Sequence, residues 1–196
     1  MRYPSSDMKS ANTWSEKVLS SGRPTGMLPS LFQVALIEPE IPQNTGNIGR
    51  TCVATAAELH LVGDLGFKIT DANLKRAGLD YWQHLRWQHH TSIPEWQAEI
   101  QNPRRAYYFS AKAEKSYTEV DYQKGDWLVF GRETQGLPDS IMQGNKEQLC
   151  LIPLLGPARG LNVATAVAVV LYEAIRQLQM RSELDSAYLD VRWGQL

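Results

Sequence analysis

The stretch Gly131-Arg-Glu-Thr-Gln-Gly-Leu-Pro138 carries the clearest signal of how this chain folds. It follows the apolar run Trp127–Phe130, which is typical of a buried strand. The chain therefore leaves a strand through a glycine loop and restarts at Pro138, a favoured first residue for a helix. Ligands of parallel sheets bind where strands end, so the adjacent Arg132 and Glu133 indicate a ligand site. The loop lacks the glycine patterns of P-loops and dinucleotide sites, and alone it identifies no ligand.

A second stretch repeats this plan after the apolar run Leu31–Ile37. It reads Ile41-Pro-Gln-Asn-Thr-Gly-Asn-Ile-Gly-Arg50, and its asparagines and threonine can cap a helix that continues through residues 53–57. This reading places Arg50 in the first helical turn, where a cation opposes the helix dipole. Such a placement favours contact with a phosphate or a ribose. The alternative is a solvated arginine on a surface helix.

A third stretch, Leu151–Asn162, leaves another predicted strand through a loop of glycine and proline. Asn162 can cap the long apolar helix that follows it. Three strand-loop-helix units of this kind predict one composite ligand pocket at the ends of the strands.

Apolar segments alternate with helical ones, which predicts an α/β fold with a parallel sheet flanked by helices. The expected strands are Phe32–Ile37, Leu59–Val62, Arg105–Phe109, Trp127–Phe130 and Leu149–Ile152. Residues 1–29, rich in Ser, Thr, Pro and Gly, are expected to form a flexible leader. Residues 30–180 then form the main domain, and residues 181–196 form a peripheral tail.

The composition is that of an ordinary globular domain of 196 residues, with 43% hydrophobic and 21% charged residues. No apolar run reaches membrane-spanning length and the first residues do not resemble a signal peptide, so a cytoplasmic protein without membrane contact is expected. Cys52 and Cys150 are interpreted as small core residues without metal-ligand spacing. His89 and His90 stand in a polar stretch and are interpreted as surface histidines, so no metal site is expected.

A formal net charge of −1 argues against indiscriminate binding of nucleic acid but allows a local basic patch. Basic residues with interleaved aromatics can grip phosphates and stack on unpaired bases. The basic residues expected to contribute are Lys68, Lys75, Arg76, Arg86, Arg104 and Arg105, and the aromatic residues are Tyr81, Trp82, Trp87, Tyr107 and Tyr108. For Tyr107 and Tyr108, packing within an apolar strand is the stronger interpretation.

The helix expected after Asn162 is apolar on nearly every face as far as Leu171. One face can cover the sheet, while the opposite face would remain exposed in a monomer of this size. We therefore expect a homodimer formed through residues 162–175, with Val167 and Val170 at the interface. The alternative is that the leader folds over this helix.

The three stretches together resemble the knotted SPOUT class of RNA methyltransferases. Within that class they are most similar to the small tRNA ribose methyltransferases of the TrmL or YibK type, the tRNA (cytidine(34)-2′-O)-methyltransferases. The matching phrases are Glu38-Pro-Glu-Ile-Pro-Gln-Asn-Thr-Gly-Asn-Ile48, Arg76-Ala-Gly-Leu-Asp-Tyr81 and Phe130-Gly-Arg-Glu-Thr-Gln-Gly-Leu-Pro138. The resemblance covers residues 31–179.

This resemblance implies a trefoil knot, a dimer, S-adenosylmethionine as methyl donor, and the wobble ribose of a tRNA anticodon stem-loop as acceptor. The positions that match the donor pocket of the family are Phe109, Gly131, Ile152 and Gly160. The positions that match its catalytic polar residues are Asn44, Arg50, Glu133 and Asn162. Arg50 is the residue that the resemblance nominates to orient the hydroxyl or remove its proton. A guanidinium is a poor base, so we expect it to orient the hydroxyl and stabilise the alkoxide.

The chain departs from the family in the third stretch, where Gly160 and Ala164 replace serines that relatives commonly carry. If only the backbone of the first serine is used, Gly160 can replace it; if its hydroxyl is used, donor binding or catalysis is affected. The departure leaves open a non-catalytic RNA-binding or assembly factor that retained the fold. A nucleotide-dependent enzyme of the doubly wound type is disfavoured by the missing glycine fingerprint.

Overall fold

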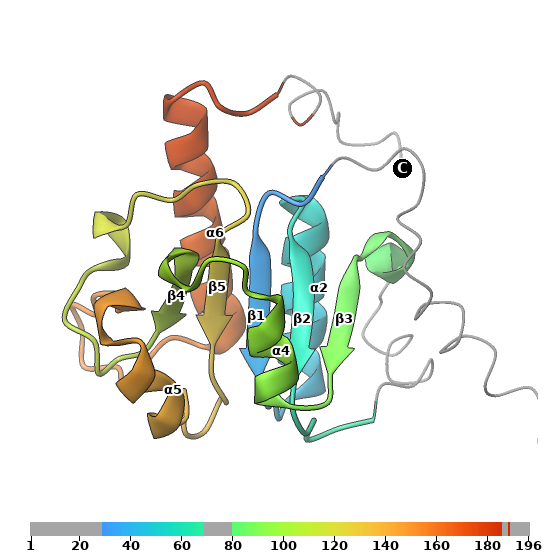
Figure 1. Ribbon diagram of the computed structural model, residues 1–196, viewed down its shortest axis with the longest axis vertical. Coiled ribbons are helices and arrows are strands. Elements are labelled where there is room, and N and C mark those ends of the chain that lie inside the picture. Colours follow the sequence, from blue (N-terminus) through green and yellow to red (C-terminus); the bar gives the residue numbers. More distant parts are fainter. Residues whose placement is uncertain (1–28, 69–79, 186–187, 189–196) are drawn as a thin grey trace, which may run out of the picture.

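The computed structural model describes residues 29–68, 80–185 and 188. Within these residues one sheet contains six strands in the order β3-β2-β1-β5-β4-β6, and every neighbouring pair is parallel (Figure 1). The strands are β1 Gln33–Ile37, β2 Glu58–Val62, β3 Trp87–His90, β4 Ala106–Phe109, β5 Trp127–Phe130 and β6 Leu149–Cys150. The predicted α/β class with a parallel sheet is confirmed. The leader expected over residues 1–29 lies almost wholly outside the described residues.

Helices cover both faces of this sheet. The α-helices are α2 Pro42–Ala54, α4 Ile93–Glu99, α5 Asp139–Gly144 and α6 Val163–Met180. Short 3-10 turns occupy Asp80–His84 (η1), Pro103–Arg105 (η2), Tyr117–Glu119 (η3) and Lys146–Gln148 (η4). In Figure 1, α4 lies in front of the sheet, and α2 and α6 lie behind it. Among the described helices, none combines the length and the apolar character needed to cross a membrane.

The alternation of side chains along each strand divides the core into two layers. On one face, Val34 and Leu36 of β1 and Leu128 of β5 pack with the inward faces of α2 and α6. On the other face, Ala35 and Ile37 pack with α4 and α5. Strands buried on both faces read as continuous apolar runs, which explains why β1 and β5 were recognisable from sequence.

Strand β3 was not predicted, and the interpretation of His90 as a surface residue was wrong. His90 is buried on β3, whereas its neighbour His89 is exposed. The His90 Nε2 atom lies 3.0 Å from Nδ1 of the buried His60, whose Nε2 lies 2.8 Å from Gln33 Oε1. Burial lowers the pKa of His60 to about 4 and also lowers the pKa of His90. A polar sequence therefore forms a strand at the edge of the described sheet, and its one buried side chain, His90, is satisfied by a hydrogen bond to His60 of the neighbouring strand.

Cys52 and Cys150 are buried, as the sequence predicted. Burial raises the pKa of both thiols, so they remain protonated near neutral pH.

The orientation of α6 corrects the predicted interface. Val167 and Val170 are fully buried against the sheet of their own protomer, together with Leu171 and Ala174. They belong to the core, and a charge at either position would unfold the protomer instead of separating two copies. The exposed face of the helix carries Tyr172, which is 57% exposed.

Candidate functional site

Three loops meet at the carboxyl edge of the sheet, and a chain of side-chain hydrogen bonds joins them. Glu133, in the loop after β5, accepts a hydrogen bond from the Glu40 backbone amide at 2.9 Å and one from Asn44 Nδ2 at 3.1 Å. The Oδ1 atom of Asn44 accepts from Asn162 Nδ2 at 2.9 Å. Three of the four predicted catalytic residues are thus brought together from segments far apart in sequence.

Glu133 also supplies the N-terminal cap of α2. The helix begins at Pro42 after Ile41, and the Ile41 side chain offers no cap. The Glu133 Oε1 atom accepts from the Ile41 amide at 3.3 Å, beside its bond to Glu40. A carboxylate here satisfies otherwise unpaired amides and interacts favourably with the positive end of the helix dipole. The expected caps, Asn44, Thr45 and Asn47, lie inside the helix, so that part of the prediction was wrong.

A second set of contacts holds the same loops at their bases. The Arg132 guanidinium forms an ion pair with the Glu38 carboxylate, and its Nε donates to Glu38 Oε2 at 2.8 Å. Thr134 donates through its hydroxyl to Glu40 Oε2 at 2.8 Å. Glu38 adopts a φ of 49°, a conformation uncommon outside glycine, directly after β1. The ion pair therefore fixes a strained turn between β1 and α2.

Backbone packing in the loop after β5 requires glycine at position 131. Arg132 and Gly136 exchange two backbone hydrogen bonds of 3.0 and 2.9 Å, and Gly136 has a φ of 71°. A Cβ atom on Gly131 would lie 2.1 Å from the Gly136 carbonyl carbon. Any larger residue at Gly131 would displace the loop itself, which makes this glycine essential to the loop conformation.

The four predicted donor-pocket residues lie at the ends of three neighbouring strands. Phe109 ends β4, and its ring stacks on that of Phe130 at 4.7 Å between centroids, directly before Gly131. Ile152 follows β6 and is half-buried, whereas Gly160 is exposed in the loop before α6. Apart from its chain neighbours, no described residue has a heavy atom within 4 Å of the place that a Cβ of residue 160 would take. A side chain at position 160 would therefore point into open space.

The segment from Ile152 to Leu161 has a backbone suited to ligand contact. Its residues after Ile152 are exposed, and none of its backbone amides or carbonyls hydrogen-bonds to another described residue. Asn162 ends this segment and caps α6 by accepting from the Ala164 amide at 2.9 Å, as predicted. Leu151, at the other end, is held by two backbone hydrogen bonds, so the loop between them can present exposed backbone groups to a ligand.

Arg50 lies apart from the hydrogen-bonded group, on the third turn of α2. It stands six residues beyond Asn44, roughly 9 Å along the helix axis. Its position is therefore not in the first turn, and the expected conflict with the helix dipole does not arise. The Arg50 guanidinium carbon lies 4.9 Å from the centroid of the Tyr81 ring. The sequence had grouped Tyr81 with RNA-stacking aromatics and gave no signal of this contact with Arg50.

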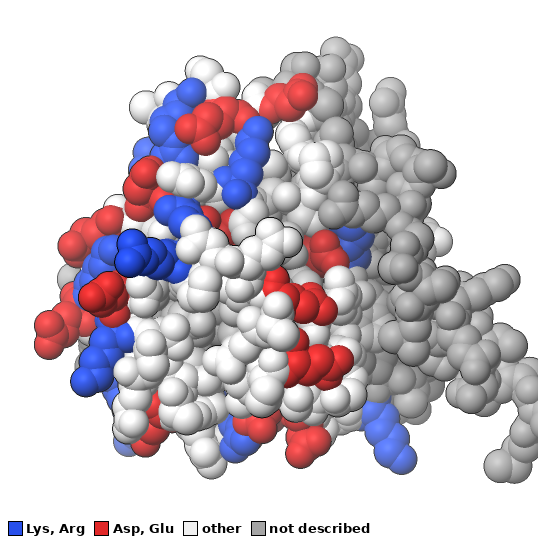
Figure 2. Space-filling view, viewed as in Figure 1, with Lys and Arg blue, Asp and Glu red and all other residues white. Residues whose placement is uncertain are grey.

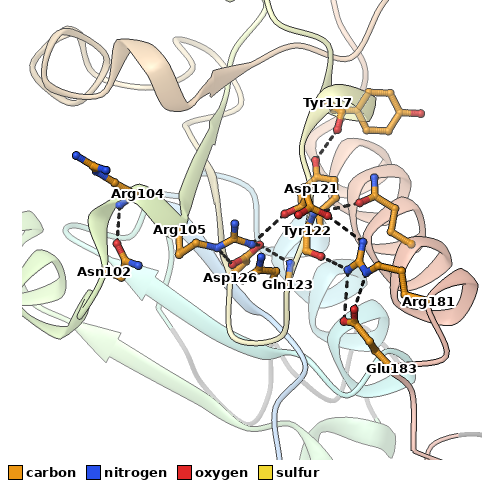
Figure 3. Close-up of polar contacts among 11 residues, drawn as sticks. Asn102, Arg104, Arg105, Tyr117, Asp121, Tyr122, Gln123, Asp126, Arg181 and Glu183 are labelled. Carbon is orange, nitrogen blue, oxygen red and sulfur yellow. Dashed lines mark hydrogen bonds and ion pairs between the residues drawn. The ribbon is translucent and has the colours of Figure 1, made fainter.

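The basic residues predicted to hold RNA are not gathered at this edge. Arg105 forms a bidentate pair with the buried Asp126, with Nε donating to Oδ1 at 2.7 Å (Figure 3). It lies before β4, at the amino edge of the sheet, where its guanidinium is engaged by Asp126, and its role on phosphates stays a prediction. Figure 3 also shows Arg181 bound to Asp121 and to Glu183 in the same region. Lys75 and Arg76 lie outside the described residues.

Charge on the α4 face of the molecule gives no uniform basic surface. Acidic and basic side chains are intermixed along one side, and the middle of this face is largely uncharged (Figure 2).

Among the described residues, one group could present three metal ligands, His60, His90 and Glu99. The two imidazoles already bond to one another through the nitrogens that face each other. The group lies on the α4 face, on the other side of the sheet from α2 and Arg50. The expected absence of a metal site stays a prediction.

Comparison with known proteins places these features in a family. The model of the SpoU rRNA Methylase family matches residues 31–172. A tRNA (cytidine(34)-2′-O)-methyltransferase of Saccharophagus degradans is 44% identical over 151 residues, which cover 76% of this chain and 96% of that protein.

Solved structures show the same likeness. One described as "Structural insights into the 2-OH methylation of C/U34 on tRNA" has a TM-score of 0.72 and 42% identity, and the match covers 79% of this chain and 94% of the other. An AdoMet-bound rRNA methyltransferase from Sinorhizobium meliloti has a TM-score of 0.67 and 27% identity, with 77% of this chain and 58% of the other covered. The matched segment contains all three loops, and this chain belongs to the SpoU rRNA methylase family.

Proposed function

We propose that this chain transfers a methyl group from S-adenosylmethionine to the 2′-hydroxyl of the wobble nucleotide, cytidine 34, of a tRNA. The observation that carries this proposal is the junction of three loops by Glu133, Asn44 and Asn162 in a chain 44% identical to a tRNA (cytidine(34)-2′-O)-methyltransferase. An anticodon loop suits the reaction, because its unstacked nucleotides present their bases and a reachable 2′-hydroxyl.

The methyl donor would be held by the loops after β5 and β6. Gly131, Ile152 and Gly160 would contact it through backbone groups, and Phe109 would pack beneath it. The fit rests on the exposed backbone of residues 152–161, which forms no hydrogen bond with another described residue, and on the open space at Gly160. When bound, S-adenosylmethionine supplies an electrophilic methyl group on a sulfonium ion.

The transfer requires a 2′-hydroxyl oxygen in line with the sulfur–methyl bond. The new C–O bond forms as the carbon–sulfur bond breaks, its electron pair returns to sulfur, and the hydroxyl proton is released. Correct placement of two reactants can lower such a barrier by roughly 7–11 kcal/mol. The guanidinium of Arg50 would stabilise the negative charge that develops on the oxygen. Asn44, Glu133 and Asn162 would fix α2 and the two loops relative to one another.

The fold is proposed to contain the trefoil knot of the SPOUT class. Residues 149–151 lie beside β4 and the segment that comes after it. The Leu151 amide donates to the Lys115 carbonyl at 2.8 Å, and the Leu151 carbonyl accepts from the Tyr117 amide at 2.9 Å. The chain then returns to Asn162, which contacts Asn44 of α2. This path, from one edge of the sheet back to its middle, supports the proposal.

We further propose that two copies associate through the exposed face of α6. This face is opposite Val167 and Val170 and carries the half-buried Val169 and the exposed Tyr172, and the exposed Leu161 lies just before the helix. Leu161 is 42% exposed and Tyr172 is 57% exposed, so an apolar strip extends from the site along the helix. Pairing would remove this strip from water and would bring the second copy next to the three loops.

Methylation of unmodified tRNA by the purified chain should place one methyl group on the ribose of nucleotide 34. Arg50→Ala should slow this reaction by about 10²–10³-fold, as loss of an oxyanion-stabilising group does elsewhere. Its affinity for S-adenosylmethionine should stay unchanged. Lys124→Ala removes a positive charge from an exposed side chain just before β5, at the opposite edge of the sheet, and is the control that should keep the parental rate.

The readout is mass spectrometry of digested tRNA combined with calorimetry of donor binding. A methyl group on a base, or on another ribose, would contradict the substrate assignment. Full activity of Arg50→Ala would contradict the role of Arg50 alone. If the chain neither binds the donor nor transfers a methyl group, the alternative of a non-catalytic RNA-binding factor would be favoured.

Substitutions at Gly160 test the donor pocket without disturbing the fold, because a Cβ there meets no protein atom within 4 Å. Gly160→Ser should bind S-adenosylmethionine as the parent does. Gly160→Trp should fill the opening and weaken donor binding by at least about tenfold, or 1.4 kcal/mol. Calorimetry checks both variants, with thermal unfolding as the control for folding. Equal affinity in the two variants would show that Gly160 lies outside the pocket.

A charge on the outer face of α6 should weaken the dimer. Tyr172→Glu should shift the association toward monomer by at least about tenfold, because pairing would bury an unpaired carboxylate. Gln143→Glu adds the same charge on α5, on the other face of the sheet, and should leave association unchanged. Sedimentation velocity over a concentration series measures both. A Tyr172→Glu protein that remains as dimeric as its parent would place the interface elsewhere.

A further inference from the structure

The contact between Arg50 and Tyr81 joins helix α2 to the 3-10 turn η1. The Tyr81 hydroxyl donates to the Gly46 carbonyl at 2.5 Å, and its ring lies 4.9 Å from the Arg50 guanidinium carbon. Gly46 and Arg50 are four residues apart and therefore lie on neighbouring turns of one helix face. One tyrosine thus binds the helix backbone with its hydroxyl and the arginine side chain with its ring.

The element that carries Tyr81 is packed firmly against the helix. A Cβ on Gly49 would lie 3.0 Å from Leu85 Cδ2 and 3.3 Å from Trp82 Cζ3, so glycine is what permits this close approach. Leu85 is buried, and the Trp82 ring packs against that of Trp87 at 5.7 Å between centroids. Tyr81 therefore sits on a fixed support next to α2.

Stacking on an aromatic ring restrains an arginine in a specific way. The guanidinium presents a flat face to the ring, while its N–H groups point outward in the plane of the group. Arg50 is exposed, and its long stem has many rotamers. A ring held by its own hydroxyl bond selects among these rotamers and keeps the N–H edge in one direction.

We propose that Tyr81 is a positioning residue that aims the Arg50 guanidinium at the ribose oxygen. This inference rests on the proposed role of Arg50 in methyl transfer. Tyr81 acts through Arg50, so its removal affects the rate of the transfer step and leaves the affinities for donor and tRNA in place. The ring supplies the larger part of the effect, and the hydroxyl supplies the anchor to Gly46.

Three variants at this position separate these contributions. Tyr81→Leu removes the ring and the hydroxyl and should lower kcat by about 10- to 100-fold, the range expected when a reacting group is displaced by about 1 Å. Tyr81→Phe keeps the ring and should recover most of the lost rate. Gln83→Ala, at an exposed neighbour in η1, should keep the parental rate and controls for general disturbance of this element. In each variant, KM for tRNA and the donor affinity should match the parent.

The decisive comparison repeats Tyr81→Leu in an Arg50→Ala background, with single-turnover methyl transfer as the readout. If Tyr81 acts through Arg50, the second substitution should cause no further loss. An additive loss, or a Tyr81→Leu effect confined to KM, would overturn the inference. So would a fully active Tyr81→Leu protein beside an inactive Arg50→Ala protein, and that result would leave the proposed function intact. A fully active Arg50→Ala protein would instead overturn the assignment of Arg50.

Discussion

The Glu133 carboxylate is the group on which the geometry of this site depends. It binds the amides of Glu40 and Ile41, which precede α2, and the side chain of Asn44 within the helix. Through Asn44 it is linked to Asn162, the residue that starts α6. One side chain from the loop after β5 therefore sets the positions of the two helices on the same face of the sheet.

These contacts explain how loops, which are usually more mobile than helices and strands, can hold reacting groups in place. The loops after β1 and β5 are tied by the Arg132–Glu38 ion pair and by Thr134 with Glu40. The segment 152–161 is followed by the anchored Asn162, and its own backbone forms no hydrogen bond with another described residue. Arg50 lies further along α2, where its guanidinium contacts the ring of Tyr81. The loops after β1 and β5 are thus held by side-chain contacts, whereas the loop before α6 has an exposed backbone.

The sequence was sufficient wherever local patterns decide the structure. Four of the six described strands were predicted to within one residue at each end, because strands buried on both faces are continuous apolar runs. The sequence did not reveal features that depend on a residue far away along the chain. The start of α2 was misplaced because its cap is Glu133, some 90 residues away, and strand β3 was missed because His90 is satisfied by His60. The periodicity of α6 could not show which face is inward, since almost every position is apolar.

Donor binding by Glu133 variants tests the central claim most directly. Glu133→Ala should weaken calorimetric binding of S-adenosylmethionine by at least about tenfold, since charge-assisted bonds to backbone amides are each worth about 1.5–3 kcal/mol. Adding Asn44→Ala to this variant should cause little further loss, because the link to Asn162 is already released. Donor affinity and methyl-transfer rate equal to the parent in a folded Glu133→Ala protein would show that the loops are assembled without this carboxylate and would contradict the account.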